Sequence, residues 1–350
     1  MLYYLPIEPI ESRYTAQMLK WVVRELDEGE WDYQVIMPDE EEHSIAQGQF
    51  LDIYGTISWK ARQIDKVSRL FNEGKVRPWD VFLIGDLWFP GIEAIPYMAT
   101  LSGIPVTIWG WHYAGCADPN DFVQPCCNLG LYEAEKSWLK LADGVFVGSL
   151  YHKNIMYEAF GDTGLVFATG LVWDYEDVRL SVPLTPVDER PKRIIFPHRC
   201  APEKNPEAFY RAAEFFADKG WDFIITSSRK GTPKDLGFKT SKYWRVLTGL
   251  SKQEYYDILS TCRVFFSSAY QETFGYALHE AVTFNVTPVC PKRLSYQEVL
   301  PSPYLYENDI GCIRKVEHYV EKPFPAPLSV TKNYHRSAKT ALDIIKGYIP

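Results

Sequence analysis

Short apolar runs alternate with amphipathic stretches along most of the chain. The first apolar runs are residues 2–5, 32–37, 80–84, 105–109 and 144–148. Their length and composition suit strands buried in a parallel sheet. Between these runs, apolar residues spaced three and four apart predict helices. The predicted helices are residues 14–26, 56–72, 92–101, 132–142 and 151–160. This alternation of strands and helices predicts a doubly wound α/β domain.

A proline-rich and charged stretch at residues 177–192 interrupts this pattern and predicts a linker. The alternation then begins again, which predicts a second α/β domain. Its strands are expected at 193–197, 221–226 and 264–267, and its helices at 206–219 and 252–261. A final helix is predicted at 334–348. The chain should therefore form two α/β domains with a cleft between them.

Composition narrows the class of protein. Its 350 residues suit two domains, and 46% hydrophobic with 23% charged residues is ordinary for a globular protein. A net charge of −8 argues against a surface that coats nucleic acid throughout, although a local basic groove stays compatible with it. Seven cysteines, with an adjacent Cys126-Cys127 pair and no CxxC, predict reduced thiols. With neither a signal peptide nor a membrane span predicted, a soluble cytoplasmic protein is expected.

The stretch 265–291, FFSSAYQETFGYALHEAVTFNVTPVCP, carries the most chemistry. It predicts a strand, a polar turn, a helix and a second strand. Glu272 and Glu280 are separated by seven residues, and Tyr276 shares a helix side with Glu280 at i,i+4 spacing. A helix N-terminus that follows glycine suits anions. One site would hold phosphate at the amides and hydroxyl groups at the carboxylates, and a nucleotide sugar has both.

Two cations follow the first strand of the second domain. Arg199 and Lys204 come after strand 193–197, and in open α/β sheets ligands bind beyond the carboxyl ends of the strands. An arginine fork and a lysine ammonium there would neutralise a diphosphate without Mg²⁺. The alternative is that both are surface residues at a strand–loop–helix junction. The two downstream carboxylates favour the binding site.

These spacings resemble one enzyme family. Arg199-x4-Lys204, followed by Glu272-x7-Glu280 around Phe-Gly, is similar to the retaining GT-B glycosyltransferases of the family-4 type over about residues 80–300. The resemblance implies a GT-B fold of two Rossmann-like domains that face a central cleft. Residues 1–185 would bind the acceptor, residues 190–332 would bind the donor, and helix 334–350 would cross back to the first domain.

The resemblance also implies roles for single residues. Arg199 and Lys204 would bind the phosphates of a nucleoside-diphosphate sugar, with no cofactor and no metal. Glu272 and the backbone of Phe274, Gly275 and Tyr276 would hold the sugar, and Glu280 the ribose. Further implied contacts are Gly249 and Leu250 to the nucleobase and His112, after strand 105–109, to the donor sugar. Retention would need no protein nucleophile, because the departing phosphate would take the acceptor's proton.

The acceptor is less defined. The family's glycine-rich first loop is replaced by residues 6–12, so candidate acceptor ligands are Glu8, Glu11, Ser12, Arg13 and Trp111. The opening YYLPIEPIESRYTAQM is similar to N-termini of phage-encoded glycosyltransferases, including ones that act on modified DNA bases. A basic loop at 229–245 and a basic helix face at 60–69 would form a track for DNA. The alternative for the loop is an ordinary solvated segment.

Other functions stay open at this point. The acceptor would otherwise be a small molecule, a lipid or a polysaccharide, and a catalytically silent nucleotide-sugar-binding protein has the same motifs. Dinucleotide-dependent oxidoreductases are disfavoured because no strand is followed by GxGxxG, and metal hydrolases because histidines and carboxylates do not cluster. His198 and His279 flank the motifs. The histidines expected at the surface are His43, His152, His318 and His335.

Overall fold

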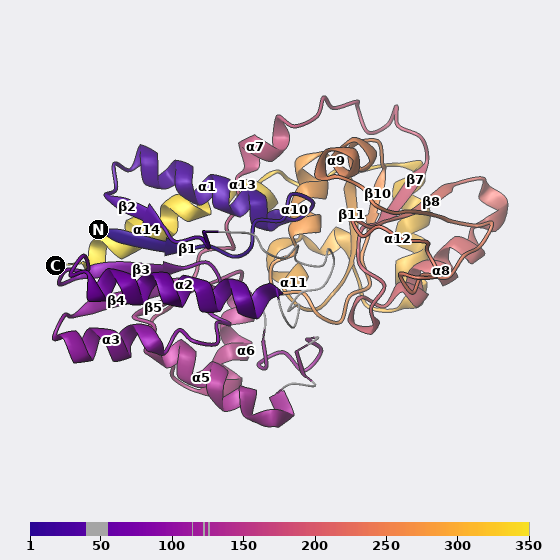
Figure 1. The fold of residues 1–350 in the computed structure, drawn as a ribbon. Coiled ribbons are helices and arrows are strands. Elements are labelled where there is room, and N and C mark those ends of the chain that lie inside the picture. Colours follow the sequence, from indigo (N-terminus) through magenta and orange to yellow (C-terminus); the bar gives the residue numbers. More distant parts are fainter. Residues whose placement is uncertain (40–54, 114, 122, 125–126, 350) are drawn as a thin grey trace. The chain divides into compact units, whose positions relative to one another are not determined.

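The computed structural model describes residues 1–39, 55–113, 115–121, 123–124 and 127–349 (Figure 1). This part of the chain divides into two compact units. Unit 1 comprises Met1–Ile10, Tyr14–Trp173 and Arg336–Pro350, and unit 2 comprises Glu11–Arg13 and Asp174–His335. Within the described residues, each unit contains one six-stranded sheet in which all neighbouring strands are parallel.

Unit 1 has the strand order β2-β1-β3-β4-β5-β6. These strands are β1 (Leu2–Leu5), β2 (Tyr33–Val35), β3 (Asp80–Ile84), β4 (Val106–His112), β5 (Gly144–Val147) and β6 (Val166–Ala168). The chain passes from β1 to β2 and then returns to the other side of β1, so the winding reverses between β1 and β3. Such a reversal is where open α/β sheets bind ligands, at the carboxyl ends of the strands.

Unit 2 repeats this design with the strand order β12-β11-β10-β7-β8-β9. Its strands are β7 (Arg193–Phe196), β8 (Asp222–Thr226), β9 (Arg245–Leu247), β10 (Val264–Phe266), β11 (Thr287–Pro291) and β12 (Leu305–Tyr306). Here the winding reverses between β7 and β10, which pair directly through Val264–Ile194 and Phe265–Ile195. The segments that follow these two strands are therefore brought together.

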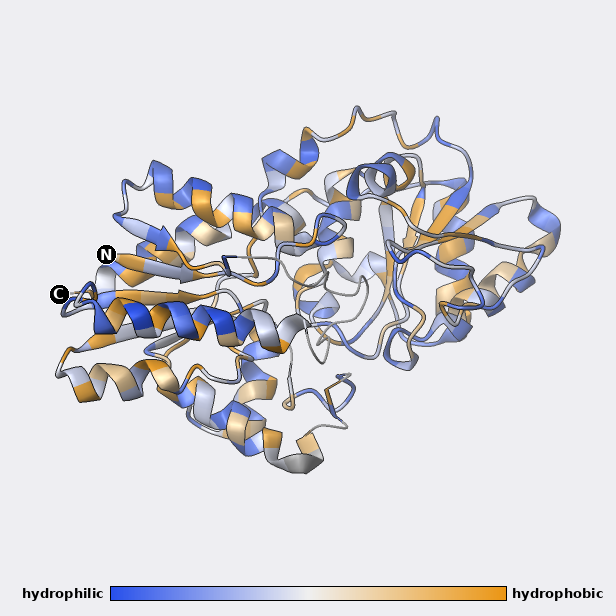
Figure 2. Ribbon diagram, in the orientation of Figure 1, coloured by the Kyte–Doolittle hydropathy of each residue, from blue (hydrophilic) through white to orange (hydrophobic). Residues whose placement is uncertain are grey.

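Helices flank both sheets. In unit 1 they are α1 (Tyr14–Glu28), α2 (Gly55–Asn72), α3 (Ala94–Ser102), a π-helix (Cys127–Leu131), α5 (Tyr132–Leu141), α6 (Leu150–Phe160) and α14 (Ser337–Tyr348). In unit 2 they are α7 (Tyr175–Arg179), α8 (Pro206–Phe215), α9 (Lys252–Ser260), α10 (Tyr276–Thr283), α11 (Tyr296–Val299), α12 (Asp309–Glu321) and α13 (Ser329–Lys332), with 3-10 turns at Pro202–Lys204, Ala217–Lys219 and Ser302–Tyr304. Strands β3, β5 and β10 are buried at every position, and orange predominates in the strands of both sheets in Figure 2. Apolar strands thus form the centre of each unit, as the runs in the sequence predict.

The last helix belongs to unit 1, which confirms the predicted return of the C-terminus to the N-terminal domain. Helix α14 packs against α1 (Figure 1). The Arg336 guanidinium, one residue before α14, donates to Glu25 and Glu28 of α1, and the Glu25 side chain is buried. A buried carboxylate needs such a counter-charge, so this ion pair fixes the end of the chain on unit 1.

The cysteine prediction is wrong at one pair. Cys116 and Cys127, eleven residues apart, form a disulfide with a Cα–Cα distance of 5.7 Å, whereas Cys200, Cys262, Cys290 and Cys312 are free. Composition and spacing carry no information on a loop that returns to itself, which is why the pairing was missed. Cys126 lies outside the described residues.

In the part of the chain that the structure describes, no helix combines the length and apolarity that crossing a membrane requires.

Candidate active site

The reversal point of the unit 2 sheet gathers the two motifs that the sequence predicts. Arg199 and Lys204 follow β7, and Glu272 follows β10. Since β7 and β10 are neighbours in the sheet, residues about seventy positions apart in the sequence lie close together at the carboxyl ends of these strands. The spacing of the motifs is thus explained by strand order.

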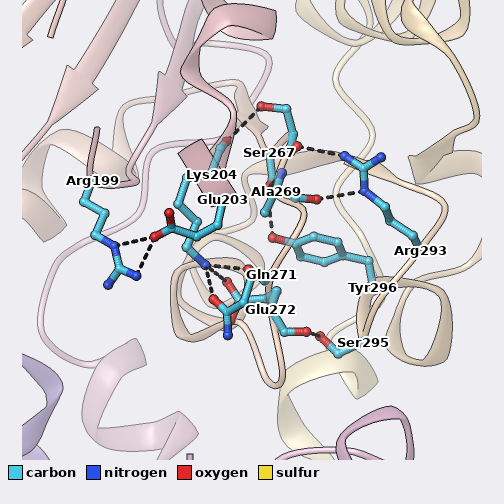
Figure 3. A network of polar contacts seen from close by, with 11 residues as sticks. Arg199, Glu203, Lys204, Ser267, Ala269, Gln271, Glu272, Arg293, Ser295 and Tyr296 are labelled. Carbon is cyan, nitrogen blue, oxygen red and sulfur yellow. Dashed lines mark hydrogen bonds and ion pairs between the residues drawn. The ribbon is translucent and has the colours of Figure 1, made fainter. Parts of the chain in front are cut away.

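Lys204 and Glu272 are in contact (Figure 3). The Lys204 ammonium lies 3.4 Å from Glu272 Oε2, donates to the Gln271 carbonyl at 2.6 Å, and lies 3.1 Å from Gln271 Oε1. Lys204 is 9% exposed and Gln271 is buried. A cation held by three oxygens keeps a fixed position, so an incoming anion meets a preorganised charge.

Arg199 stands on the other side of the turn after β7. Its Nε and NH2 atoms donate to Glu203 Oε1 at 2.8 and 2.5 Å, across an i,i+4 pair in which Arg199 is the more exposed partner. Glu203 sits next to Lys204 in a 3-10 turn and its carbonyl accepts from Tyr270 N at 2.7 Å. Glu203 therefore ties the Arg199 guanidinium to the turn that carries Lys204.

The turn that carries Glu272 is held by the segment between β11 and α11 (Figure 3). Arg293 donates to the carbonyls of Ala269 and Ser268, both at 2.8 Å, and its guanidinium lies 4.3 Å from the Tyr270 ring centroid. Ser295 Oγ donates to the Glu272 carbonyl at 3.2 Å. These contacts satisfy carbonyls that would otherwise be unpaired at a strand end.

Helix α10 begins as the motif predicts. Gly275 caps it with φ +88°, a conformation that glycine adopts without strain, and a Cβ there would lie 3.5 Å from Glu272 Cγ. Phe274 is buried, with its ring 4.2 Å from His279 and 5.2 Å from Tyr276. The Phe274 side chain thus anchors the turn, which leaves backbone amides at the start of α10 as ligand groups.

Glu280, the second carboxylate, is buried in α10. Its Oε1 atom accepts from the Tyr256 hydroxyl at 3.1 Å and from the Lys252 ammonium.

The predicted nucleobase segment precedes α9. Gly249, with φ +71°, donates to the Arg229 carbonyl at 2.8 Å, and Leu250 N to the Ser227 carbonyl at 3.2 Å.

His112 lies at the end of β4 in unit 1, where the sequence predicts it. The side chain is completely buried, with Nδ1 3.0 Å from His152 Nε2 and Nε2 3.1 Å from Glu135 Oε1. Glu135 also accepts from Trp88 Nε1 at 3.0 Å and from Cys116 N at 2.8 Å. Three hydrogen-bond donors satisfy the fully buried Glu135 carboxylate, and its contact with Nε2 fixes the orientation of the His112 imidazole.

The candidate acceptor residues are divided between the units. Glu8 and Trp111 belong to unit 1 and are buried, and Glu8 Oε1 has no hydrogen-bond partner among the residues that the structure describes. Glu11, Ser12 and Arg13 group with unit 2, where Glu11 is exposed and the other two are half-buried. Glu8 lies three residues after β1, at the reversal point of the unit 1 sheet.

The predicted basic helix face is wrong at Lys60 and partly neutralised at Lys66 and Arg69. Lys60 is buried, donates to the Trp88 carbonyl and lies 3.6 Å from Asp86, while Lys66 pairs with Asp39 and Arg69 with Asp65. The loop at 229–245 is also partly neutralised, because Lys239 pairs with Glu207 and Arg245 with Asp222. Sequence periodicity places side chains on a helix face, but it does not identify the neighbour that covers that face.

Three histidines are buried without charge. The expectation that His152 lies at the surface is wrong, because His152 is buried against His112. Burial is the main cause that holds the pKa of His152 well below its usual range, and the neighbouring His112 is the second. Burial, then Lys204 and Arg199, lowers the pKa of His198 in the same way. Burial lowers the pKa of His279 to about 3. His318 is exposed and His335 half-buried, and His43 lies outside the described residues.

These histidines predict acid sensitivity. In the unfolded chain a histidine binds a proton below about pH 6.5, but a folded histidine with a lowered pKa does not. As the pH is lowered below about 6.5, the free energy of unfolding should therefore decrease by about 1.4 kcal/mol per pH unit for each of these histidines. For His279 this decrease should continue down to about pH 3. In His279→Gln the loss between pH 7 and pH 5, measured by urea unfolding, should shrink by about 2 kcal/mol. The exposed control His318→Gln should keep the full loss, and an unchanged loss in His279→Gln would contradict the assignment.

Several residues that contact the predicted site residues within each unit were not found by the sequence analysis. Glu203 and Gln271 had a usable signal, since each adjoins a motif residue and Glu203 stands at i,i+4 from Arg199. Glu135, Lys252 and Tyr256 had none, because their roles come from tertiary contacts. Among the described residues, no group of three or more His, Cys, Asp or Glu side chains has the arrangement of a metal site.

Comparisons with known proteins agree with this architecture. Sucrose-phosphate synthase from Thermosynechococcus elongatus superimposes with a TM-score of 0.69 at 12% identity, over 99% of this chain and 98% of that one. Trehalose-6-phosphate synthase OtsA superimposes with a TM-score of 0.66 at 10% identity, over 100% and 99% of the two chains. The chain has the GT-B fold. The predicted resemblance to GT-B glycosyltransferases is thereby confirmed at the level of fold.

Two further comparisons add detail. HepE of Anabaena, solved with UDP-glucose, superimposes with a TM-score of 0.60 at 12% identity over 99% of this GT-B chain and 95% of its own. A tRNA-queuosine alpha-mannosyltransferase of Drosophila melanogaster is 27% identical over 143 residues. That alignment spans 39% of this chain and 38% of the fly protein. No protein-family model matches the sequence.

Proposed function

We propose that the chain is a glycosyltransferase that moves a sugar from a nucleoside-diphosphate sugar to a hydroxyl acceptor, with retention of anomeric configuration. One observation carries the proposal: the contact of Lys204 with Glu272 at the carboxyl ends of β7 and β10. It joins a cation suited to phosphate to a carboxylate suited to sugar hydroxyls. The GT-B fold, shared with a protein solved with UDP-glucose, supports the same conclusion.

The donor would use the residues of unit 2. Arg199 and Lys204 would bind the diphosphate, together with amides at the start of α10. Glu272 would accept hydrogen bonds from the sugar hydroxyls and Glu280 from the ribose, while the backbone at Gly249 and Leu250 would contact the base. Bound phosphate would then compete with Glu203 for the Arg199 guanidinium, since both are anionic ligands of the same fork.

The chemistry would rest on orientation and charge. As the sugar–phosphate bond breaks, its electron pair stays on the phosphate oxygen, and Arg199 and Lys204 would stabilise that charge. The acceptor hydroxyl would attack from the same face, and its proton would pass to the departing phosphate. In this scheme the two cations supply the charge that a divalent metal supplies elsewhere, so turnover should be equal with excess EDTA and with added Mg²⁺.

For the acceptor we propose a hydroxyl group on a modified nucleoside of a nucleic acid. The similarity to the tRNA-queuosine alpha-mannosyltransferase supports it, because the name of that enzyme places its sugar on a tRNA nucleoside. A hydroxymethylated base in DNA is the second form of the same acceptor chemistry. A sugar, lipid or other small molecule is the competing acceptor.

The test begins with the donor. Thermal shifts with UDP, GDP, ADP and TDP, and with their common sugars, should give one nucleotide that raises the melting temperature by mass action. The matching labelled nucleotide sugar is then incubated with total tRNA, hydroxymethylated DNA or simple glycosides. Label in tRNA or DNA supports the nucleoside acceptor, and label only in glycosides overturns it. No shift with any nucleotide would overturn the glycosyltransferase itself.

A further inference from the structure

The carboxylate of Glu280 is held by two residues of the neighbouring helix α9. Glu280 is 3% exposed, and a carboxylate buried to that extent is costly unless it is paired and hydrogen-bonded. The Lys252 ammonium supplies the opposite charge, and the Tyr256 hydroxyl, also buried, donates a second hydrogen bond at 3.1 Å. Both contacts fall on the same atom, Oε1.

Lys252 is itself fixed by its surroundings. It is the first residue of α9, whose start is set by a capping box in which Ser251 Oγ accepts from Glu254 N and the Glu254 side chain accepts from Ser251 N. The ammonium lies 4.9 Å from the centroid of the Tyr256 ring and 5.2 Å from that of the Tyr255 ring. Cation–π attraction to two rings restricts a side chain that is otherwise flexible.

The Lys252 and Tyr256 contacts determine how Glu280 can receive a ligand. An oxygen that already accepts from an ammonium and a phenol has little capacity left, so an incoming hydroxyl group should use Oε2. We propose that Lys252 and Tyr256 are positioning residues that hold Glu280 with Oε2 available to the ribose of the nucleotide donor. This inference rests on the proposed function, from which the ribose role of Glu280 comes.

If so, the affinity of the protein for the ribose hydroxyl groups of the donor depends on Lys252. Removing the ammonium would leave Glu280 without its counter-charge, and the carboxylate would lose the contact that fixes its rotation. A rotated carboxylate loses the hydrogen bond to the ribose, and such a bond to a charged group is worth about ten-fold or more in affinity. A nucleotide without that hydroxyl group should lose much less.

The experiment measures affinities by titration calorimetry. The nucleoside diphosphate that shifts the melting temperature is compared with its 2′-deoxy and 3′-deoxy forms. The wild-type protein should prefer the ribonucleotide by about ten-fold over at least one deoxy form. Lys252→Met and Glu280→Gln should each remove most of this preference. Lys252→Met/Glu280→Gln should lose no more than Glu280→Gln alone, because Lys252 acts through Glu280.

Matched variants separate this role from a structural one. Lys219→Met removes another ion pair of unit 2, an exposed one with Glu317, and should leave the preference unchanged. Lys252→Arg keeps the charge and should restore part of it. If Lys252→Met does not fold, Tyr256→Phe carries the test, since it deletes only one hydroxyl group and should narrow the preference.

The outcomes distinguish the two levels of the proposal. A wild-type protein that binds no nucleotide overturns the proposed function. A wild-type protein that prefers the ribonucleotide, with folded Lys252→Met or Tyr256→Phe keeping the full preference, leaves the proposed function intact and overturns the positioning role. Equal binding of ribo- and deoxynucleotides by the wild-type protein also overturns it.

Discussion

Lys204→Ala should lower kcat/KM for sugar transfer by about 10²–10³-fold, the loss seen when one preorganised donor to a developing charge is removed. Lys204 is nearly buried and its ammonium sits among Gln271 and Glu272 oxygens. Without Lys204, the charge on the departing diphosphate would be met by Arg199 alone, for which the phosphate competes with Glu203. The measurement is initial rates against donor concentration, with the nucleotide that stabilises the wild-type protein.

The control for Lys204 is a lysine of the same unit outside the site. Lys192 is exposed and pairs with Glu321 at 2.6 Å, so Lys192→Ala should keep near wild-type turnover. Loss of the Lys204 ammonium also leaves Glu272 without its cation, which can lower stability, so melting temperatures of both variants must accompany the rates. A folded Lys204→Ala protein with wild-type kcat/KM would contradict the assigned phosphate contact.

The sequence was sufficient for the central elements of the fold. Strand β3 has its predicted bounds, and α1, α2 and α5 begin within one residue of the predicted positions. Long amphipathic stretches show a clear helical period, and a continuous apolar run of about five residues is typical of a buried strand, so both are recognised from the sequence alone. The strands that were missed, β6, β9 and β12, have two or three residues each, and so short a run has no period. Their identity comes from pairing with a longer strand at the sheet edge.

The candidate site divides in the same way. Arg199 and Lys204 follow a predicted strand end, Glu272 lies in a predicted turn and Glu280 in the helix after it, and the resemblance of their spacing to one family predicted the four together. Lys60 shows the limit of this reasoning, because a lysine on a polar helix face reads as solvated until Trp88 and Asp86 cover it. A contact between segments far apart in the sequence, such as Lys252 with Glu280, leaves no pattern in either segment.

Glu272→Gln should nearly abolish transfer while the protein stays folded. The two side chains have almost the same shape, so the change removes charge and acceptor strength rather than volume. Glutamine places an amide NH₂ near the Lys204 ammonium, 3.4 Å from the present Oε2 atom, and it accepts sugar hydroxyls less well than a carboxylate. A reduction of at least about 10²-fold in kcat is expected, with a smaller change in nucleotide affinity.

The Glu272→Gln variant also tests whether this residue is a nucleophile. In the proposed scheme Glu272 orients the sugar, so neither the wild-type protein nor any variant should form a covalent sugar adduct, and the product should keep the donor's anomeric configuration by NMR. Intact-mass measurement on wild-type protein incubated with donor alone checks the first point. An adduct that forms on the wild-type protein but not on Glu272→Gln would show that Glu272 is the nucleophile of a double displacement, because a glycosyl ester forms only on a carboxylate oxygen of that residue.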